Sequence, residues 1–117
     1  MGITYIEGTV SGPNGRSEAV RFLVDSGASY TLLPEKMWRA IDLSPERSMS
    51  FSLADGTIVE RNISECLIEL PAGKCHTPVV LGEGGDEEPL LGVVTLEELG
   101  LVFDPFRREL RTMMARM

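Results

Sequence analysis

Apolar and polar residues alternate along much of this chain, and the alternation predicts a fold made largely of β-strands. The clearest case is the strand predicted over Glu18–Val24. Val20, Phe22 and Val24 would point to one face of a sheet, and Leu23 would point to the other. Because both faces are apolar at this end, we expect the strand to be buried on both sides.

Turn signals divide the rest of the chain into short segments. Asn14-Gly15 is a strong hairpin signal between the first two strands. Pro34 opens a short helix, and Gly100 ends a second one, in which Thr95 is well placed to cap. We expect helices over residues 35–41 and 94–99, and strands over residues 4–10, 18–24, 30–33, 49–53, 57–70, 76–81, 101–103 and 109–114. The prediction is a mostly β chain with two short helices.

The composition is that of one compact domain, which we take as residues 1–117. Hydrophobic residues make up 43% of the chain and charged residues 25%, which excludes a disordered or fibrous protein. The net charge of −7 argues against nucleic acid as a partner, because phosphate contacts need clustered Lys and Arg. No apolar run approaches the roughly 20 residues of a membrane span, and the N-terminus has no signal-peptide pattern. We therefore expect no membrane partner and a cytoplasmic location.

Two cysteines, Cys66 and Cys75, do not make a disulfide framework. If Pro71–Lys74 forms a hairpin turn, Leu70 pairs with Cys75 and Cys66 with Val79, which holds the two sulfurs too far apart to bond. Cys75 and the histidine after it lack the second Cys/His pair that a zinc site requires. We expect reduced thiols, no metal and no cofactor.

The candidate chemistry lies where the buried strand ends, at Asp25. A carboxylate directly after an apolar run is costly unless hydrogen bonds support it. Gly27 lets the backbone fold tightly past the carboxylate, Ala28 keeps the walls close, and the hydroxyl of Ser26 can fix a neighbouring chain. An ordinary Asp-Ser-Gly turn also fits these residues, and in that case Asp25 only caps a turn.

Two motifs resemble those of the aspartic proteases, particularly the single-domain retroviral-type (retropepsin-like) group. Phe22-Leu23-Val24-Asp25-Ser26-Gly27-Ala28-Ser29 resembles the active-site loop of that family. Pro89-Leu90-Leu91-Gly92, followed by the second predicted helix, resembles the segment that crosses behind this loop. The resemblance extends from Thr4 to Met113 and implies a single-domain acid-protease fold with a closed, barrel-like sheet. It gives Leu90, Leu91 and Gly92 the role of supporting the catalytic loop.

The turn Ala54-Asp55-Gly56-Thr57 falls between the two motifs, where the resembling family has a flap that closes over substrate. The local sequence alone would make it a routine surface hairpin. The turn is short and polar, unlike the glycine-rich tips of viral flaps.

The resemblance implies peptide hydrolysis by two carboxyl groups that share a proton and activate one water. Two like charges about 3 Å apart cannot both ionise, so one carboxylate acts as general base while its protonated partner polarises the scissile carbonyl. The chain contains a single Asp-Ser-Gly, so the second Asp25 must come from another copy across a two-fold axis. We therefore predict a homodimeric aspartic endopeptidase, active only as a dimer, that cuts peptides or proteins.

By resemblance, Gly27, Ala28 and Ser29 would line the peptide cleft while Ser26 braces the loop. The retroviral pattern usually has an acid where Ser29 stands. A non-catalytic dimerisation or peptide-binding module that retains the fold therefore stays open as the alternative function.

The chain termini are candidates for the dimer interface, again by resemblance, over Ile3–Ile6 and Leu110–Met114. For the methionines at 113, 114 and 117, a frayed tail is an equal alternative. The arginines at 107, 108, 111 and 116 could also meet the acidic residues 83–88 across the dimer, although exposed ion pairs contribute little.

Overall fold

The structure is a computed structural model and describes residues 3–114. Its strands are β1 (Tyr5–Ser11), β2 (Ser17–Val24), β3 (Thr31–Leu33), β4 (Arg47–Ser52), β5 (Ile58–Leu70), β6 (Gly73–Leu81), β7 (Leu90–Leu91), β8 (Leu101–Asp104) and β9 (Glu109–Thr112). Two short helices, α1 (Glu35–Ala40) and α2 (Val93–Glu98), follow β3 and β7. Both helices and all the predicted strands are present, with ends shifted by a few residues.

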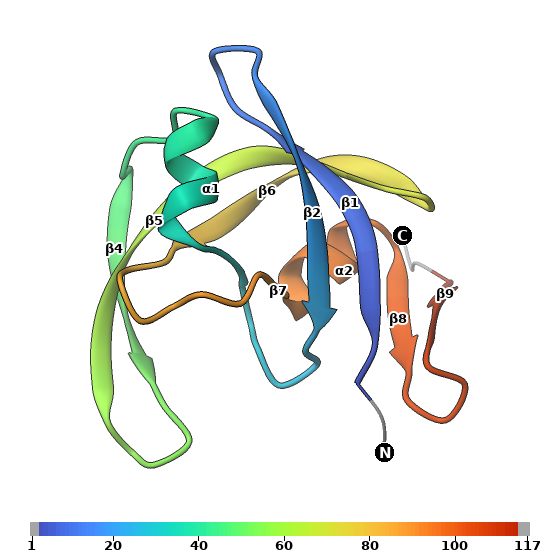
Figure 1. Cartoon of the computed structure of the whole chain (residues 1–117). Coiled ribbons are helices and arrows are strands. Elements are labelled where there is room, and N and C mark those ends of the chain that lie inside the picture. The colour runs from blue at the N-terminus through green and yellow to red at the C-terminus, as the bar shows by residue number, and fades with distance from the viewer. Residues whose placement is uncertain (1–2, 115–117) are drawn as a thin grey trace.

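Within the described residues, the first seven strands form one sheet in the order β1-β2-β7-β3-β6-β5-β4. β1 also pairs with β5, with Val10 opposite Ile68, so the sheet closes on itself and β4 extends beyond the ring (Figure 1). β7 lies parallel to β2 and antiparallel to β3, which inserts it between the two strands that flank the Asp25 loop. The expected fold class, mostly β with a closed sheet and two short helices, is confirmed.

The closed sheet surrounds a single apolar core. Its fully buried side chains include Phe22, Leu33, Ile68 and Leu91, and each of them comes from a different strand. Val20, Phe22 and Val24 are buried as the alternation predicts, whereas Leu23 on the other face of β2 is only half-buried. Burial of these aliphatic and aromatic side chains is the main term that stabilises such a fold.

The β5–β6 hairpin differs from the prediction in its register. Leu70 lies opposite Gly73 and Cys66 opposite Thr77, so the turn contains only Pro71 and Ala72. Gly73 follows the turn with a φ of +154°, a conformation that glycine adopts at no steric cost, and this permits the tighter connection.

Both cysteines are free thiols, and Cys66 is buried. Burial raises the pKa of the Cys66 thiol to about 12, which makes it a poor nucleophile.

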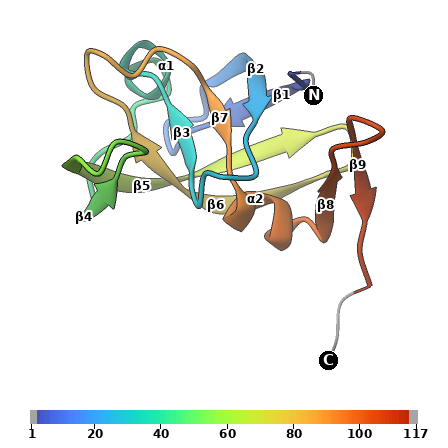
Figure 2. The same ribbon diagram turned by 90° about the horizontal axis from the view of Figure 1, so that it is seen from below.

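The C-terminal part of the described chain forms a separate two-stranded sheet, β8–β9, which α2 connects to the closed sheet. Leu101 pairs with Thr112 at its base and Asp104 with Glu109 near its turn. Figure 2 shows this hairpin beside α2, at the opposite end of the molecule from β4. Neither described helix has the length and apolar character needed to cross a membrane.

Candidate active site

Asp25 stands directly after the last residue of β2, where that strand runs parallel to β7. Val24 lies opposite Leu91, and the backbone N–H of Asp25 donates to the Leu91 carbonyl at 3.2 Å. The N–H of Val24 donates to the Thr4 carbonyl at 2.9 Å on the other side. The start of the loop is therefore fixed on both sides, by β7 and by Thr4, the residue before β1, and Asp25 is held half-buried at this end of the sheet.

The loop turns back immediately after the carboxylate. The Gly27 N–H donates to Oδ1 of Asp25 at 2.9 Å, and the Ala28 N–H donates to the Asp25 carbonyl at 3.1 Å. A Cβ at position 27 would lie 3.2 Å from Oδ1, so a side chain there would crowd the carboxylate. The Asp-Ser-Gly sequence thus supplies the hydrogen-bond support that an acid at the end of an apolar strand requires.

Gly92 holds the far side of the loop. A Cβ at this position would collide with the backbone of Tyr30 and Thr31. This close approach lets the first turn of α2 bind the loop, because the N–H groups of Val93 and Val94 donate to the carbonyls of Ala28 and Ser29, each at 2.9 Å. The first turn of a helix has N–H groups without intrahelical partners, and here the loop carbonyls satisfy two of them. Leu90, Leu91 and Gly92 thus pass behind the Asp25 loop, with Gly92 in direct contact with it.

A buried chain of three threonine hydroxyls lies under this contact. Oγ1 of Thr95 is 2.7 Å from Oγ1 of Thr31 and 3.0 Å from Oγ1 of Thr77, and all three residues are fully buried. The Gly92 N–H donates to Thr31 Oγ1 at 3.1 Å. The cap predicted for Thr95 is wrong, because α2 begins two residues earlier and its N-cap residue is Gly92. Thr95 faces the interior instead, where its hydroxyl joins α2 to β3 and β6.

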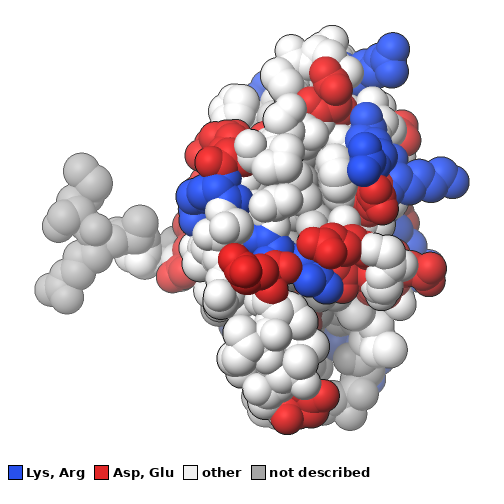
Figure 3. Space-filling view, turned by 90° about the vertical axis from the view of Figure 1, so that its left-hand side faces the viewer, with Lys and Arg blue, Asp and Glu red and all other residues white. Residues whose placement is uncertain are grey.

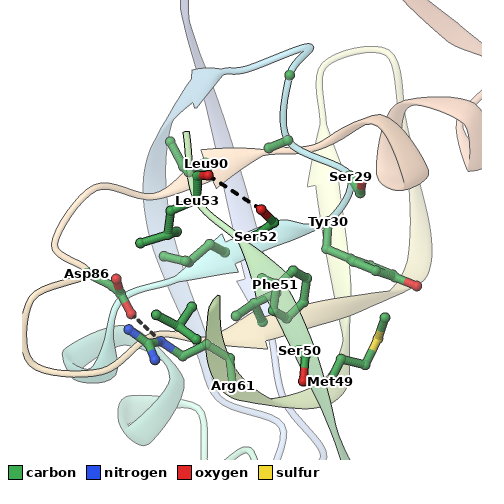
Figure 4. A pocket seen from close by; sticks show the side chains of 15 residues that line it. Ser29, Tyr30, Met49, Ser50, Phe51, Ser52, Leu53, Arg61, Asp86 and Leu90 are labelled. Atoms are coloured by element: carbon green, nitrogen blue, oxygen red, sulfur yellow. Dashed lines mark hydrogen bonds and ion pairs between the residues drawn. The ribbon is translucent and has the colours of Figure 1, made fainter. Parts of the chain in front are cut away.

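A pocket of about 470 Å³ opens beside the loop. Gly27, Ala28 and Ser29 line one side of it. The other walls come from Tyr30 on the same loop, from strand residues Leu32, Val80 and Leu90, and from Asp86 between β6 and β7. The arms of the β4–β5 hairpin complete them with Met49, Ser50, Phe51, Ser52, Leu53, Val59 and Arg61 (Figure 4). The walls are mainly apolar. Asp25 and Ser26 are not among the lining residues.

The β4–β5 hairpin reaches over this pocket with its arms but not with its tip. The rings of Phe51 on β4 and Tyr30 on the loop meet edge to face, with centroids 6.1 Å apart. Of the predicted flap, Ala54, Asp55, Gly56 and Thr57 are all exposed, and none of them lines the pocket. Their turn is nevertheless ordered, since the Gly56 N–H donates to the Leu53 carbonyl at 2.9 Å and Gly56 has a φ of +88°.

Comparison with known protein families gives a match over residues 11–98 to the family described as "gag-polyprotein putative aspartyl protease". The chain belongs to the gag-polyprotein aspartyl protease family. Among solved structures, the solution structure of simian foamy virus (mac) protease is similar with a TM-score of 0.57 and 18% identity over 82% of this chain and 94% of that chain. This likeness shows a retroviral protease fold. A comparison with curated proteins finds no match.

In this family member, the structure brings together the two motifs that carried the resemblance, the loop at Asp25–Ser29 and the segment Leu90–Gly92. Sequence reasoning missed the threonine chain, although Thr95 stands among Val93, Val94 and Leu96, where a polar side chain on an apolar helix face is the available signal. Among residues 3–114, no group of three His, Cys, Asp or Glu side chains is arranged to hold a metal ion.

An ion pair at the rim of the pocket was also missed, and no local pattern predicts it. Nε of Arg61 on β5 donates to Oδ2 of Asp86 at 2.8 Å (Figure 4). Glu83 lies 4.0 Å from the same guanidinium. Partial burial opposes ionisation of Asp86, but the hydrogen bonds from Arg61 and from the Glu83 N–H, with the charge of Arg61, outweigh it and lower the pKa of Asp86. Figure 3 shows this side of the molecule, where acidic and basic side chains are interspersed.

This ion pair bears on the expectation that residues 83–88 meet the C-terminal arginines across a dimer. Glu83 and Asp86 are engaged with Arg61 in their own chain, and Arg111 lies 3.4 Å from Asp104 within the β8–β9 hairpin. Positions 116 and 117 lie outside the described residues. Of the termini predicted for the interface, Ile3 is 68% exposed and Met114 97% exposed.

Proposed function

We propose that this chain is an aspartic endopeptidase whose active site forms between two copies, with one Asp25 from each. The observation that carries the proposal is the hydrogen-bonded Asp25 loop, which holds a half-buried carboxylate at the end of β2, beside an apolar pocket. Membership of an aspartyl protease family supports the reaction class. The single Asp-Ser-Gly supports the need for a second copy. The proposal treats residues 1–117 as one protease domain.

In the proposed mechanism, the two Asp25 carboxyl groups lie about 3 Å apart and share one proton, because like charges at that distance cannot both ionise. The ionised carboxylate takes a proton from a water molecule, which attacks the scissile carbonyl carbon. The protonated carboxyl polarises the carbonyl oxygen and donates to it, which gives a tetrahedral diol. Proton transfer to the amide nitrogen then breaks the C–N bond and releases an amine and a carboxylic acid.

The other residues take supporting roles in the proposal. Ser26 braces the loop against the partner copy, and Gly27, Ala28 and Ser29 line the peptide cleft. Leu90, Leu91 and Gly92 support the loop from behind.

The turn Ala54–Thr57 acts as the tip of a flap. Because this tip is exposed and lies outside the pocket, it must move toward a bound peptide to cover it.

The pocket supports a preference for peptides with large apolar side chains next to the cleaved bond. Its volume of about 470 Å³ and its mainly apolar walls fit an aliphatic or aromatic side chain better than a charged one. The free cysteines are typical of a reducing compartment, and the proposal places the enzyme in the cytoplasm.

The test is an Asp25→Asn variant assayed on a library of peptides with apolar residues. We expect it to fold and dimerise like the wild type but to lose at least 10³-fold in kcat/KM, because Asn cannot act as general base. Asp42→Asn is the matched control, since Asp42 is exposed with a φ of +61° that Asn tolerates, and it should retain full activity. Unchanged cleavage by Asp25→Asn would eliminate Asp25 as the catalytic group.

The exposed flap tip and Ser29 favour a second candidate, a non-catalytic module that binds peptides or dimerises. That function predicts a wild-type chain that binds apolar peptides at the pocket without cleaving them. The same library assay distinguishes the two functions, because only the endopeptidase releases new amino termini.

A further inference from the structure

An aromatic side chain is held out into solvent at the turn of the β8–β9 hairpin. Phe106 is 93% exposed. The turn that carries it is ordered, because Oδ1 of Asp104 accepts hydrogen bonds from the N–H groups of Phe106 at 3.0 Å and Arg107 at 3.2 Å. Oδ2 of the same carboxylate accepts from Arg111 at 3.4 Å. The turn therefore holds this large apolar side chain in a fixed position, where a partner could bind it.

A depression of about 200 Å³ lies at the other end of the same hairpin. It is bounded by the base of β8 and by α2, and its apolar lining includes Leu96, Val102, Phe103 and Met113. Ser26, from the loop that carries Asp25, borders it as well. The exposed aromatic and the apolar depression are therefore on one hairpin, and the depression touches the candidate active site.

Symmetry brings these two features together. In Figure 1 the β8–β9 turn, the loop after β2 and the β4–β5 turn all extend to the lower side of the molecule. A partner whose Asp25 meets this Asp25 must approach from that side. Any two-fold axis lying in that face reverses the direction of a hairpin that projects through it, so the two β8–β9 hairpins run antiparallel. Where the axis also brings the two hairpins side by side, the tip of each lies against the base of the other.

The charges around the two features are complementary. Arg107 and Arg108 follow Phe106 and are exposed. Glu97 borders the depression, and Glu98 is its exposed neighbour on α2. An approach that places Phe106 in the depression brings cations to anions, which favours this orientation over a parallel one.

We infer that Phe106 of each protomer inserts into the depression between α2 and the base of β8 in a second copy of the chain. This inference rests on the proposed dimer and names the contact that forms it. The contact occurs twice in each dimer, and because Ser26 borders the depression, it also positions the two Asp25 loops relative to each other.

The inference is tested by sedimentation analysis of dimer dissociation in parallel with peptide cleavage. Phe106→Asp should raise the dimer dissociation constant at least tenfold, and cleavage should fall at low protein concentration and recover at high concentration. The thermal midpoint of the monomer should be unchanged, because Phe106 is exposed within its own chain. Ala72→Asp, which adds the same charge at the exposed β5–β6 turn, is the matched control and should dimerise like the wild type.

Exchanging the charges of Arg107 and Glu97 provides a second test. Arg107→Glu and Glu97→Arg should each weaken the dimer by about threefold to tenfold, and the double variant should recover most of the loss. The inference would be overturned if Phe106→Asp and Arg107→Glu both still cleave peptides and dimerise with a dissociation constant within twofold of wild type. The proposed function would then stand. A wild-type chain that is monomeric at every concentration would overturn both the inference and the proposed function. Sedimentation of the wild-type chain alone shows this.

Discussion

The backbone N–H of Asp25 donates a hydrogen bond to the carbonyl of Leu91, 3.2 Å away, across a parallel pairing of β2 and β7. This bond is one of those that join the two motifs, which stand more than sixty residues apart in the sequence. It also sets where the carboxylate emerges, because β7 continues directly into Gly92 and the first turn of α2, which bind the rest of the loop. The position of Asp25 therefore depends on Leu91, Gly92 and the first turn of α2, which take no part in the proposed reaction.

Gly92 is the most sensitive of these groups. A Gly92→Ala variant places a methyl group against the backbone of Tyr30 and Thr31, neither of which can move without breaking the hydrogen bonds of the loop. We expect a loss of about 1–3 kcal/mol in the free energy of unfolding, typical of overpacking, together with loss of peptide cleavage. Chemical denaturation measures the first quantity. Gly85→Ala is the control, because a Cβ there meets nothing within 4 Å, and an equal loss in both variants would contradict the argument.

Thr95 tests the buried hydroxyl chain. Thr95→Val keeps the shape of the side chain but removes the hydroxyl that joins Thr31 and Thr77. We expect a cost of about 1–3 kcal/mol in the free energy of unfolding, because buried hydroxyls lose their partner. Thr9→Val on β1, a half-buried position, should change stability by no more than about 0.5 kcal/mol. Equal denaturation midpoints for Thr95→Val and wild type would show that the chain of hydroxyls does not stabilise the fold.

Asp86 gives a pH-dependent prediction. Its folded-state pKa lies below the ordinary value of 3.8, so the ion pair with Arg61 stabilises the fold fully above that value. The contribution is lost as the pH falls below 3.8 and through the lower folded-state pKa. Asp86→Asn should therefore be less stable than wild type at pH 7, and the difference should shrink as the pH falls below 3.8. Thermal unfolding across this range measures it, and Glu87→Gln, exposed on the same loop, should show no such convergence.

Phe51 links the β4–β5 hairpin to the candidate active site. Phe51→Ala removes its edge-to-face contact with Tyr30 and widens the apolar pocket. We expect KM to rise about tenfold for peptides with large apolar side chains, since loss of one aromatic contact and its buried area costs about 1–2 kcal/mol. Peptides with small side chains should be affected less. Steady-state kinetics on matched peptide pairs measures the difference, and equal effects on both classes would contradict the assignment of this pocket to a substrate side chain.

The sequence predicted those parts of the fold that local patterns determine. Alternation identified β2, Asn14-Gly15 marked the first hairpin, and Gly100 marked the end of α2. The predicted register of the β5–β6 hairpin was wrong, because Pro71–Lys74 can form either a two-residue or a four-residue turn. Thr95 was misplaced because a threonine near a helix start is a good cap unless tertiary packing supplies better partners.

The candidate site was likewise predicted only where a sequence motif marks it. The loop Asp25–Ser29 and the segment Leu90–Gly92 were recognised as motifs, and the structure brings them into contact. The Arg61–Asp86 ion pair joins residues 25 positions apart across the mouth of a pocket, and only the folded arrangement reveals it. The exposed Phe106 carries no sequence signal, since a phenylalanine near a turn is as readily buried as exposed.

The most direct test of the account mixes wild-type chains with Asp25→Asn chains and measures peptide cleavage. If each active site needs one Asp25 from each copy, mixed dimers are inactive, so an equal amount of the variant should lower wild-type activity to about half, and a large excess should abolish it. Asp42→Asn chains added in the same amounts should leave the activity unimpaired. Wild-type activity that is unchanged by excess Asp25→Asn, under conditions where the two chains exchange partners, would contradict the shared active site.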